Sequence, residues 1–417
     1  MFIYEIERGD TLYNIAKSYN VSVDDIAKLN NIDSNETLVV GQAIVIPQDY
    51  IRYSVARGDS LYRIARRYGV TIDDILAVNP DITGTIIYPN QIINIPYNAI
   101  SPRDVVVNAY MLPGISTESL NSALPYLDYL SIFSYEVMPD GSLREVMDER
   151  YIDIALNRGI KPLMVVTNIN SNGFSSETAH QLFTNPTSTA NFIQNVISVM
   201  NEKGYYGLNV DFEYLYPEDK DNYINFLRML STVLKQNGYI LAVAVAPKES
   251  ANQVGLLYEA HDYKTIGEIA DIVIIMTYEW GYLYGEPQAI SPANRIENVI
   301  SYAVTDIPSD KILLGVSNYA YDWTLPYVSG TPAMYLSNMQ ALNLARNKGS
   351  FIMFDSKAQS PYFTYYNNGA KHIVWFEDVR SLLAKLNIVE KYNLLGISYW
   401  NINFAINPSG LLVTKNN

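Results

Sequence analysis

From about Asp104 onward the chain repeats one pattern, a short Val- and Ile-rich run followed by a stretch with helical spacing. Eight such runs are predicted as strands: Val105–Tyr110, Tyr129–Tyr135, Lys161–Thr167, Gly207–Phe212, Ile240–Ala246, Ile272–Thr277, Ile312–Ser317 and Gly396–Trp400. Most are apolar on both faces, which is typical of parallel strands covered by helices. This alternation predicts an α/β fold, a (β/α)8 TIM barrel. The alternative is a doubly wound open sheet, but no glycine-rich phosphate loop follows the first strand.

One interval in this pattern is too long for a single helix. About 75 residues, 319 to 393, separate the seventh and eighth predicted strands, whereas most connections in compact domains are far shorter. We expect a small α+β insertion here that walls one side of a substrate groove.

The first 96 residues are a tandem repeat. Shifting the chain by 49 positions superposes Arg8-Gly9-Asp10 on Arg57-Gly58-Asp59, Asn30 on Asn79, and Ile46-Pro47 on Ile95-Pro96, without any gap. Each copy is predicted as a strand, two helices and a closing strand, with Asp10 or Thr11 capping the first helix. The N-terminal region is therefore two βααβ modules.

These modules resemble the LysM domain in the residues Gly9-Asp10-Thr11-Leu12, Asn30, Gly41-Gln42 and Ile46-Pro47; the second copy has Asn90-Gln91 in place of Gly41-Gln42. The resemblance implies binding to N-acetylglucosamine-containing glycans such as peptidoglycan and chitin. Its glycan groove would lie between the Gly-Asp-Thr-Leu loop and the loop after Asn30. The expected domains are 1–48 and 50–97 for the two modules and 103–417 for the barrel. A repeat that serves only assembly is the alternative.

Composition excludes several classes of function. The chain has 29 Lys and Arg against 43 Asp and Glu, a net charge of −14, so a nucleic acid is not an expected partner. It has no cysteine and only three histidines, far apart in sequence, so no metal site and no cofactor are expected. The N-terminus lacks the apolar core of an export signal, and no apolar run is long enough to cross a membrane. The 35 tyrosines suit carbohydrate binding, because their rings combine an apolar face with a polar edge.

The fourth predicted strand carries the candidate chemistry. Side chains alternate along a strand, so Asn209, Asp211 and Glu213 share one face and the apolar residues between them share the other. The apolar face must meet the outer helices, which directs the polar face into the barrel. Buried carboxyl groups are costly, so this pattern favours catalysis over a capping role at the strand end.

This strand resembles the DGxDxDxE motif of glycoside hydrolase family 18, with Tyr206 at the first Asp and Asn209 at the second. Met276-Thr277-Tyr278-Glu279 resembles the MTYD motif of the same family, and Tyr399-Trp400 supplies the tryptophan expected at the end of the eighth strand. Combined with two LysM copies, the chain looks like the spore cortex-lytic N-acetylglucosaminidases of endospore-forming bacteria.

The resemblance implies a role for each of these residues. Glu213 would be the general acid, Asp211 would hold the acetamido N–H of the substrate, and Tyr278 would hydrogen-bond the acetamido oxygen. Trp400 would form the floor under the sugar ring. Asn209, Glu279 and Tyr399 would complete the substrate site, and Trp280 and Trp323 are candidates for outer subsites.

The expected function is a retaining N-acetylglucosaminidase that cleaves peptidoglycan, in particular spore cortex, using the 2-acetamido group of its substrate. A catalytically inactive, lectin-like barrel and a chitinase are the alternatives; intact Glu213 disfavours the first, and the missing export signal disfavours the second. We expect a protein made in the cytoplasm without a signal peptide and acting in the spore, with no membrane partner. A monomer is expected, and the sequence leaves endo against exo cleavage open.

Overall fold

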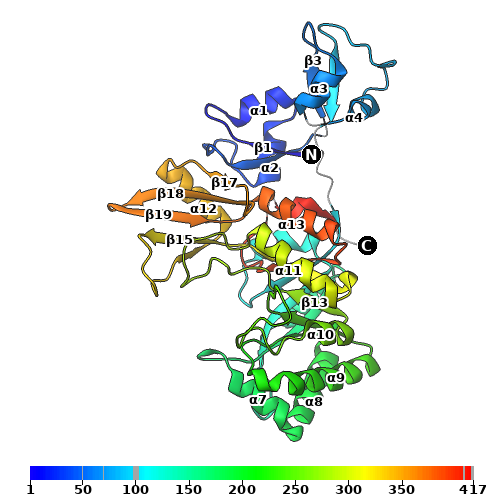
Figure 1. The fold of residues 1–417 in the computed structure, drawn as a ribbon, viewed down its shortest axis with the longest axis vertical. Helices are drawn as coiled ribbons and strands as arrows, with labels where there is room; N and C mark the ends of the chain where they lie inside the picture. The colour runs from blue at the N-terminus through cyan, green and yellow to red at the C-terminus, as the bar shows by residue number, and fades with distance from the viewer. Residues whose placement is uncertain (49, 69, 97–102, 407–408, 415–417) are drawn as a thin grey trace.

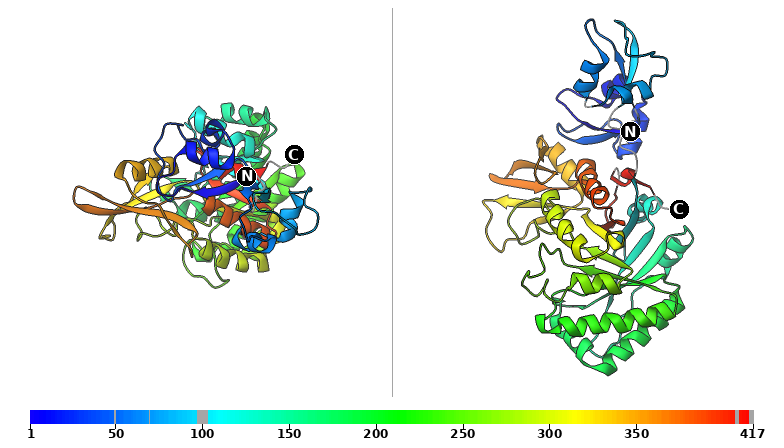
Figure 2. Two further views of the ribbon diagram at one scale, coloured as in Figure 1. Left: turned by 90° about the horizontal axis from the view of Figure 1, so that it is seen from above. Right: turned by 45° about the vertical axis from the view of Figure 1, so that its right-hand side comes forward.

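The computed structural model describes residues 1–48, 50–68, 70–96, 103–406 and 409–414. The predicted junction between the second module and the barrel, residues 97–102, lies outside these ranges. The two N-terminal modules lie one beyond the other at one end of the molecule, and the barrel occupies the other end (Figure 1). A sheet inserted late in the chain extends sideways between them, as the second view in Figure 2 also shows.

The barrel confirms the predicted fold. Its strands pair in the order β11-β12-β13-β14-β20-β6-β7-β8, and all of these pairs are parallel. They are β6 (Val106–Met111), β7 (Tyr129–Glu136), β8 (Lys161–Thr167), β11 (Gly207–Asp211), β12 (Ile240–Val245), β13 (Ile272–Ile275), β14 (Ile312–Ser317) and β20 (Gly396–Trp400). Pairing of β11 with β8 closes the ring.

Helices cover the barrel because each carries an apolar stripe that the outward faces of the strands can bury. They are α5 (Thr117–Ala123), α6 (Glu149–Leu156), α7 (Ser176–Thr184), α8 (Pro186–Lys203), α9 (Lys220–Gln236), α10 (Tyr263–Ile269), α11 (Ala293–Asp306) and α13 (Val379–Lys391). On α9, Ile224, Leu227, Leu230 and Leu234 form such a stripe and belong to the main core cluster. Over the described ranges, no helix combines the length and apolarity that crossing a bilayer requires.

The insertion is a five-stranded antiparallel sheet with one helix, placed between β14 and α13. Its strand order is β16-β15-β19-β18-β17. The elements are β15 (Ala320–Leu325), β16 (Met334–Leu336), α12 (Asn338–Lys348), β17 (Met353–Asp355), β18 (Ser360–Asn367) and β19 (Ala370–Trp375). The predicted span of 319 to 393 contains this sheet and also α13, which packs on α11, β14 and β20 as a barrel helix.

Each N-terminal module is a two-stranded antiparallel sheet with two helices, in the predicted βααβ order. The first contains β1 (Phe2–Glu5), α1 (Leu12–Tyr19), α2 (Val23–Asn30) and β2 (Ala43–Ile46); the second contains β3 (Tyr50–Ser54), α3 (Leu61–Tyr68), α4 (Ile72–Ala77) and β4 (Ile92–Pro96). Thr11 caps α1, whereas Asp10 accepts hydrogen bonds from Glu7 N and the Tyr4 hydroxyl and so closes the turn. Asn30 bonds the backbone of Ile26 and of Val45, which ties α2 to β2.

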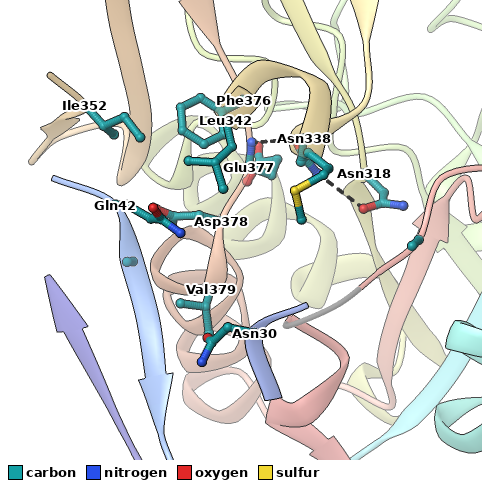
Figure 3. Close-up of a pocket in the computed structure, with 13 residues that line it drawn as sticks. Asn30, Gln42, Asn318, Asn338, Leu342, Ile352, Phe376, Glu377, Asp378 and Val379 are labelled. Atoms are coloured by element: carbon teal, nitrogen blue, oxygen red, sulfur yellow. Dashed lines mark hydrogen bonds between the residues drawn. The ribbon is translucent and has the colours of Figure 1, made fainter. Parts of the chain in front are cut away.

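The first module packs directly against the barrel part of the chain. β2 contacts α13, and Val45 belongs to the main core cluster. A small cavity of about 60 Å³ remains between the module, α12 and the start of α13, where Asn30 and Gln42 face Asn338 and Asp378 (Figure 3).

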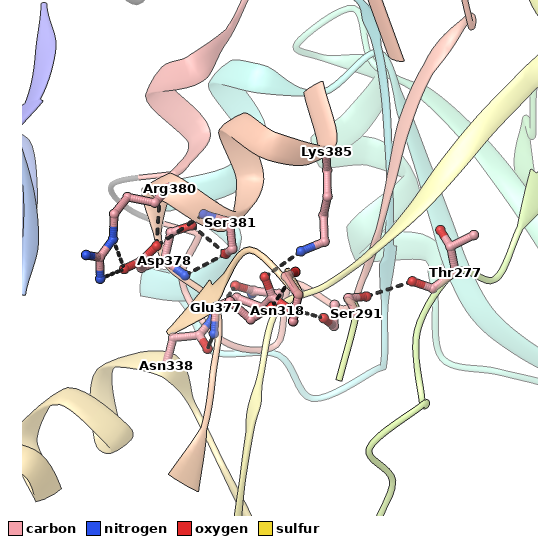
Figure 4. Close-up of polar contacts among 12 residues, drawn as sticks. Thr277, Ser291, Asn318, Asn338, Glu377, Asp378, Arg380, Ser381 and Lys385 are labelled. Carbon is pink, nitrogen blue, oxygen red and sulfur yellow. Dashed lines mark hydrogen bonds and ion pairs between the residues drawn. The ribbon is translucent and has the colours of Figure 1, made fainter. Parts of the chain in front are cut away.

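A buried polar network joins the insertion to the barrel (Figure 4). Glu377 forms an ion pair with Lys385 at 2.7 Å, accepts a hydrogen bond from Ser317 Oγ at 3.1 Å, and donates its backbone N–H to Asn338 Oδ1 at 2.9 Å. Lys385 is fully buried, so this ion pair is shielded from water. Asn338 continues the network to Asn318, whose side chain donates to the carbonyls of Asn401 and Phe404.

Candidate active site

Strand β11 brings the two carboxyl groups to the C-terminal end of the barrel. Leu208, Val210 and Phe212 enter the core between barrel and helices, as the alternation predicts. Asp211 ends the strand on the inner face, and Glu213 follows two residues later. In this fold the C-terminal end of the strands is where chemistry occurs.

A pocket of about 500 Å³ opens at this end of the barrel. It contains five of the residues singled out from the sequence: Asp211, Glu213, Tyr278, Glu279 and Trp400. Aromatic side chains that no motif predicts supply much of the remaining wall: Phe133, Phe174, Tyr214, Tyr258 and Tyr282. Trp280, a predicted subsite residue, also lines the pocket, whereas Trp323 is buried elsewhere and donates its indole N–H to Gly285 O.

The backbone around Glu213 is clamped from two sides. Asn168, just after β8, donates its side-chain N–H to Glu213 O at 2.8 Å and accepts from Glu213 N at 3.0 Å. His261 is buried and bonds Phe212 O through Nε2 at 3.0 Å, while its Nδ1 accepts from Ala246 N. Burial lowers the pKa of His261 to about 4, so it is a neutral support. Sequence reasoning missed Asn168, and only its place after a barrel strand hints at this role.

Trp400 forms a cluster of three aromatic rings with Phe133 and Tyr110. The centroid of its ring lies 4.9 Å from that of Phe133 and 5.3 Å from that of Tyr110, and both contacts are edge-on. The structure does not bring Tyr399 to the pocket: successive residues of a strand point to opposite faces, and Tyr399 joins the core between β20 and the helices.

The two departures from the family motif lie away from the pocket wall. Asn209 is buried one layer deeper than Asp211 and donates to the Tyr110 hydroxyl at 2.7 Å and to Ser131 Oγ at 3.3 Å. Tyr206 precedes β11 at the opposite end of the barrel, where Lys161 lies 5.0 Å from its ring.

Glu279 connects the pocket to the insertion. Its backbone lies in the left-handed region, with φ of 64°. Its carboxylate accepts hydrogen bonds from the hydroxyls of Tyr319, which directly precedes β15, and of Tyr321, which lies on β15. The inserted sheet therefore holds one wall of the pocket in place.

Burial dominates the electrostatics of the site. It raises the pKa of Asp211 to about 7. Burial, followed by the charges of Asp211 and Glu279, raises the pKa of Glu213 well above its usual range. Burial also raises the pKa of Glu279, although the Tyr319 and Tyr321 hydroxyls act in the opposite direction. At neutral pH Glu213 therefore keeps its proton.

Within the described part of the chain, Asp211 Oδ1 is a buried oxygen with no hydrogen-bond partner. Among the described residues, no group of three or more His, Cys, Asp or Glu side chains is arranged to hold a metal ion. The pocket presents three carboxyl groups, those of Asp211, Glu213 and Glu279, together with Tyr278 and an aromatic wall.

A (β/α)8 barrel with a protonated carboxyl beside a second carboxyl in an aromatic pocket has the construction of a glycoside hydrolase. Comparison with known families agrees: the model for glycosyl hydrolases family 18 matches residues 132–405, and the LysM domain model matches residues 4–47 and 53–96. The chain belongs to glycoside hydrolase family 18 and carries two LysM domains, which confirms both resemblances.

Similar proteins extend over the whole chain. The cortical fragment-lytic enzyme of Bacillus subtilis is 41% identical over 423 residues, covering 99% of this chain and 97% of that protein. The crystal structure of the spore cortex-lytic enzyme SleL of Bacillus megaterium superposes with a TM-score of 0.88 at 35% identity, covering 100% of this chain and 99% of that one. SleL of Bacillus cereus gives 0.86 at 36% identity, covering 100% and 98%.

Proposed function

We propose that this protein is a retaining N-acetylglucosaminidase that cleaves peptidoglycan by substrate-assisted catalysis. The observation that carries the proposal is the pairing of Glu213, which burial keeps protonated, with Asp211 in one pocket. A carboxylic acid that holds its proton at neutral pH is suited to protonate a leaving group.

In the first step Glu213 gives its proton to the glycosidic oxygen as the bond from this oxygen to the anomeric carbon breaks. The carbonyl oxygen of the substrate's 2-acetamido group forms the new bond to that carbon, giving an oxazolinium ion; this route needs no enzyme nucleophile. Asp211 accepts the acetamido N–H, using the oxygen that has no partner in the described chain, and its negative charge balances the oxazolinium.

Tyr278 and Trp400 place the reacting sugar. The Tyr278 hydroxyl donates to the acetamido oxygen, and burial raises its pKa far enough to keep it a donor. The Trp400 ring lies under the sugar ring, held by Phe133 and Tyr110. In the second step Glu213 takes a proton from water as that water opens the oxazolinium, so the anomeric configuration is retained.

Two facts support cortex peptidoglycan as the substrate. Relatives that match over the whole chain include proteins named as cortical fragment-lytic and spore cortex-lytic enzymes. The matches to those relatives cover 99% and 100% of this chain, so they include its LysM domains as well as its barrel. We accordingly expect the protein to act in the spore.

The test compares Glu213→Gln with wild type on spore cortex, vegetative peptidoglycan and chitin. Glutamine keeps the shape of the side chain but has no proton to give, so we expect a loss of about 10²- to 10⁴-fold in rate with binding retained. Glu202→Gln, at an exposed position on α8, is the matched control and should be fully active.

Mass spectrometry of the released fragments identifies the bond that is cut. Wild type should release fragments ending in reducing N-acetylglucosamine, and NMR of the first product should show the anomer of the substrate. Cleavage of a substrate without its 2-acetamido group would refute the assisted mechanism. Binding without cleavage by wild type would favour the lectin-like alternative.

A further inference from the structure

The two LysM modules occupy different environments although they are copies of one unit. In the first module the loop between α2 and β2, residues 36–43, lies against the insertion and the start of α13. In the second module the corresponding residues, 85–92, are exposed for the most part. Val39 is 4% exposed, whereas Tyr88, its equivalent 49 residues later, is 66% exposed.

Two arginines of the catalytic part hold the first module. Arg346 on α12 donates to Thr37 O at 2.6 Å and pairs with Glu36 at 2.6 Å. Arg380 on α13 pairs with Glu5 at 2.6 Å and donates to Gly41 O at 3.1 Å.

Both arginines are largely withdrawn from water. The Arg346 and Arg380 side chains are 13% and 12% exposed, and Glu36 is 27% exposed, so the Arg346–Glu36 pair is screened less than an ordinary surface pair, whereas Glu5 is 61% exposed. Arg380 also binds Asp378, the cap of α13, and its guanidinium lies 4.5 Å from the Phe354 ring of β17. One side chain thus connects the module, the barrel helix and the inserted sheet.

The backbones themselves meet at Gly41. Ile352 N donates to Val40 O at 2.9 Å, and a Cβ on Gly41 would lie 1.9 Å from the Ile352 carbonyl oxygen. No side chain larger than hydrogen fits there while the module is docked. Figure 3 shows Ile352, Gln42 and Asp378 around the adjoining cavity.

The residues through which the first module contacts the catalytic part are replaced in the second module. The first module has Glu5, Glu36, Val39, Gly41 and Ala43 where the second has Ser54, Thr85, Tyr88, Asn90 and Ile92. Each acidic partner of an arginine is thus absent from the second copy. The glycine that the contact requires is Asn90 there, and Asn90 adopts the same left-handed conformation, with φ of 67° against 83° for Gly41.

We propose that residues 36–43 of the first module are an intramolecular docking surface, which makes this module a fixed part of the catalytic body and leaves polymer binding to the second module. The assignment of polymer binding to the second module rests on the proposed function, in which the substrate is a glycan polymer. The exposed apolar side chains Tyr88, Ile86 and Ile92 give the second module a surface on which sugar faces can pack.

Gly41→Asn tests the docking. Asparagine occupies the same turn in the second module, so the first module should fold, but its side chain cannot coexist with Ile352. Asn90→Gly is the matched control, because it makes the reverse change where the structure shows an exposed loop. The chain has no cysteine, so spin labels at Tyr13→Cys and Tyr366→Cys, which replace side chains 65% and 69% exposed, report one distance only.

We expect a single narrow distribution of the distance between the two labels in the doubly labelled protein without further changes and in its Asn90→Gly variant. In the Gly41→Asn variant we expect a broad distribution at longer distances. A narrow distribution that survives Gly41→Asn would overturn the docking.

Retention on insoluble peptidoglycan tests whether the second module binds the polymer. We expect Tyr88→Ala to bind about 10-fold more weakly than wild type and Gly41→Asn to bind no more weakly than wild type. Full retention of Tyr88→Ala together with loss in Gly41→Asn would assign binding to the first module and overturn the proposal. Wild type that is not retained would refute polymer binding by the LysM modules, whereas the cleavage assay decides the proposed function and the distance measurement decides the docking.

Discussion

At the scale of single residues, the position of Glu213 depends on two side chains that never touch its carboxyl group. Asn168 holds the Glu213 peptide, and His261 holds the carbonyl of Phe212. Both act on the backbone where β11 has ended, so they replace the ladder hydrogen bonds that the strand no longer provides. Small displacements of a catalytic group are costly, which makes these supports part of the machinery.

Asn168→Ala should lower kcat about 10- to 100-fold while changing KM little, because the acid is misplaced and the sugar-binding wall stays intact. The measurement is steady-state kinetics on a soluble oligosaccharide. Asn170→Ala is the control, since the exposed Asn170 side chain accepts a hydrogen bond from Asn172 N at the surface. A raised KM with unchanged kcat would contradict a positioning role.

Asp211 makes stability depend on pH in a direction opposite to that of ordinary carboxylates. Burial raises its pKa from 3.8 to about 7 in the folded protein, so the folded state binds more protons than the unfolded state between these values. The free energy of unfolding therefore falls as pH rises from about 4 to about 7. Asp211→Asn should be more stable than wild type by about 2 kcal/mol at pH 8 and nearly equal to it at pH 4.

Urea denaturation at the two pH values measures this difference. Asp140→Asn is an informative control, because hydrogen bonds from Ser142 lower the pKa of Asp140 and its removal should cost stability on the neutral side. A gain in Asp211→Asn that is the same at both pH values would refute the titration argument.

At the scale of elements, α13 links three parts of the protein. Its start carries Asp378 and Arg380, which face the first module, and one turn further Lys385 faces Glu377 and the end of β14 (Figure 4). Through Asn338 and Asn318 the same network reaches the segment that follows Trp400. The insertion is therefore fixed to the barrel beside the proposed sugar platform.

Lys385→Met should destabilise the catalytic part by about 3 kcal/mol, because it leaves the Glu377 carboxylate buried without its partner. Adding Glu377→Gln should recover most of this loss, since the uncompensated charge is gone. Lys391, on the same helix as Lys385, forms an exposed ion pair with Glu297 of α11, so Lys391→Met should cost less than about 1 kcal/mol. Equal costs for the two lysines, measured by urea denaturation, would contradict the buried-pair argument.

The elements that the sequence predicted well are those with local signals. The strand β11 is buried on both faces, as its apolar residues predict, and Thr11, one of the two predicted caps, caps α1. The contacts that complete the site are not local: Asn168 and His261 lie 45 and 49 residues from the backbone groups they hold. Tyr399 was misplaced for a different reason, because a motif names neighbouring residues while a strand sends them to opposite faces.

At the scale of the whole molecule, the modules divide between two cooperative units. Each module has a core cluster of its own, but Val39 and Val45 of the first module also belong to clusters shared with the insertion and the barrel. Among the described residues, the cluster of the second module, with Val55, Leu61 and Ile75, is shared with no other part of the chain. A unit whose core is shared with no other unit can unfold alone.

Calorimetry should accordingly show a small transition for the second module, separate from the main transition. Hydrogen exchange should show amides of β2 as protected as those of the barrel and amides of β4 exchanging at a lower free energy. Gly41→Asn should move the first module into the less protected group, with Asn90→Gly as its control. A single transition with uniform protection would show that both modules unfold with the barrel.

Because the first module is docked on the barrel and the second is not, the two modules differ in how easily they can be replaced by protein engineering. The first module is fitted to this particular barrel through Gly41, Glu5 and Glu36, so replacing it with a foreign module would remove the Glu36 partner of Arg346 and the Glu5 partner of Arg380. Over the described residues, the second module has no such fit to the barrel. It is the site at which a different carbohydrate-binding unit can be grafted to send the same hydrolase to another wall.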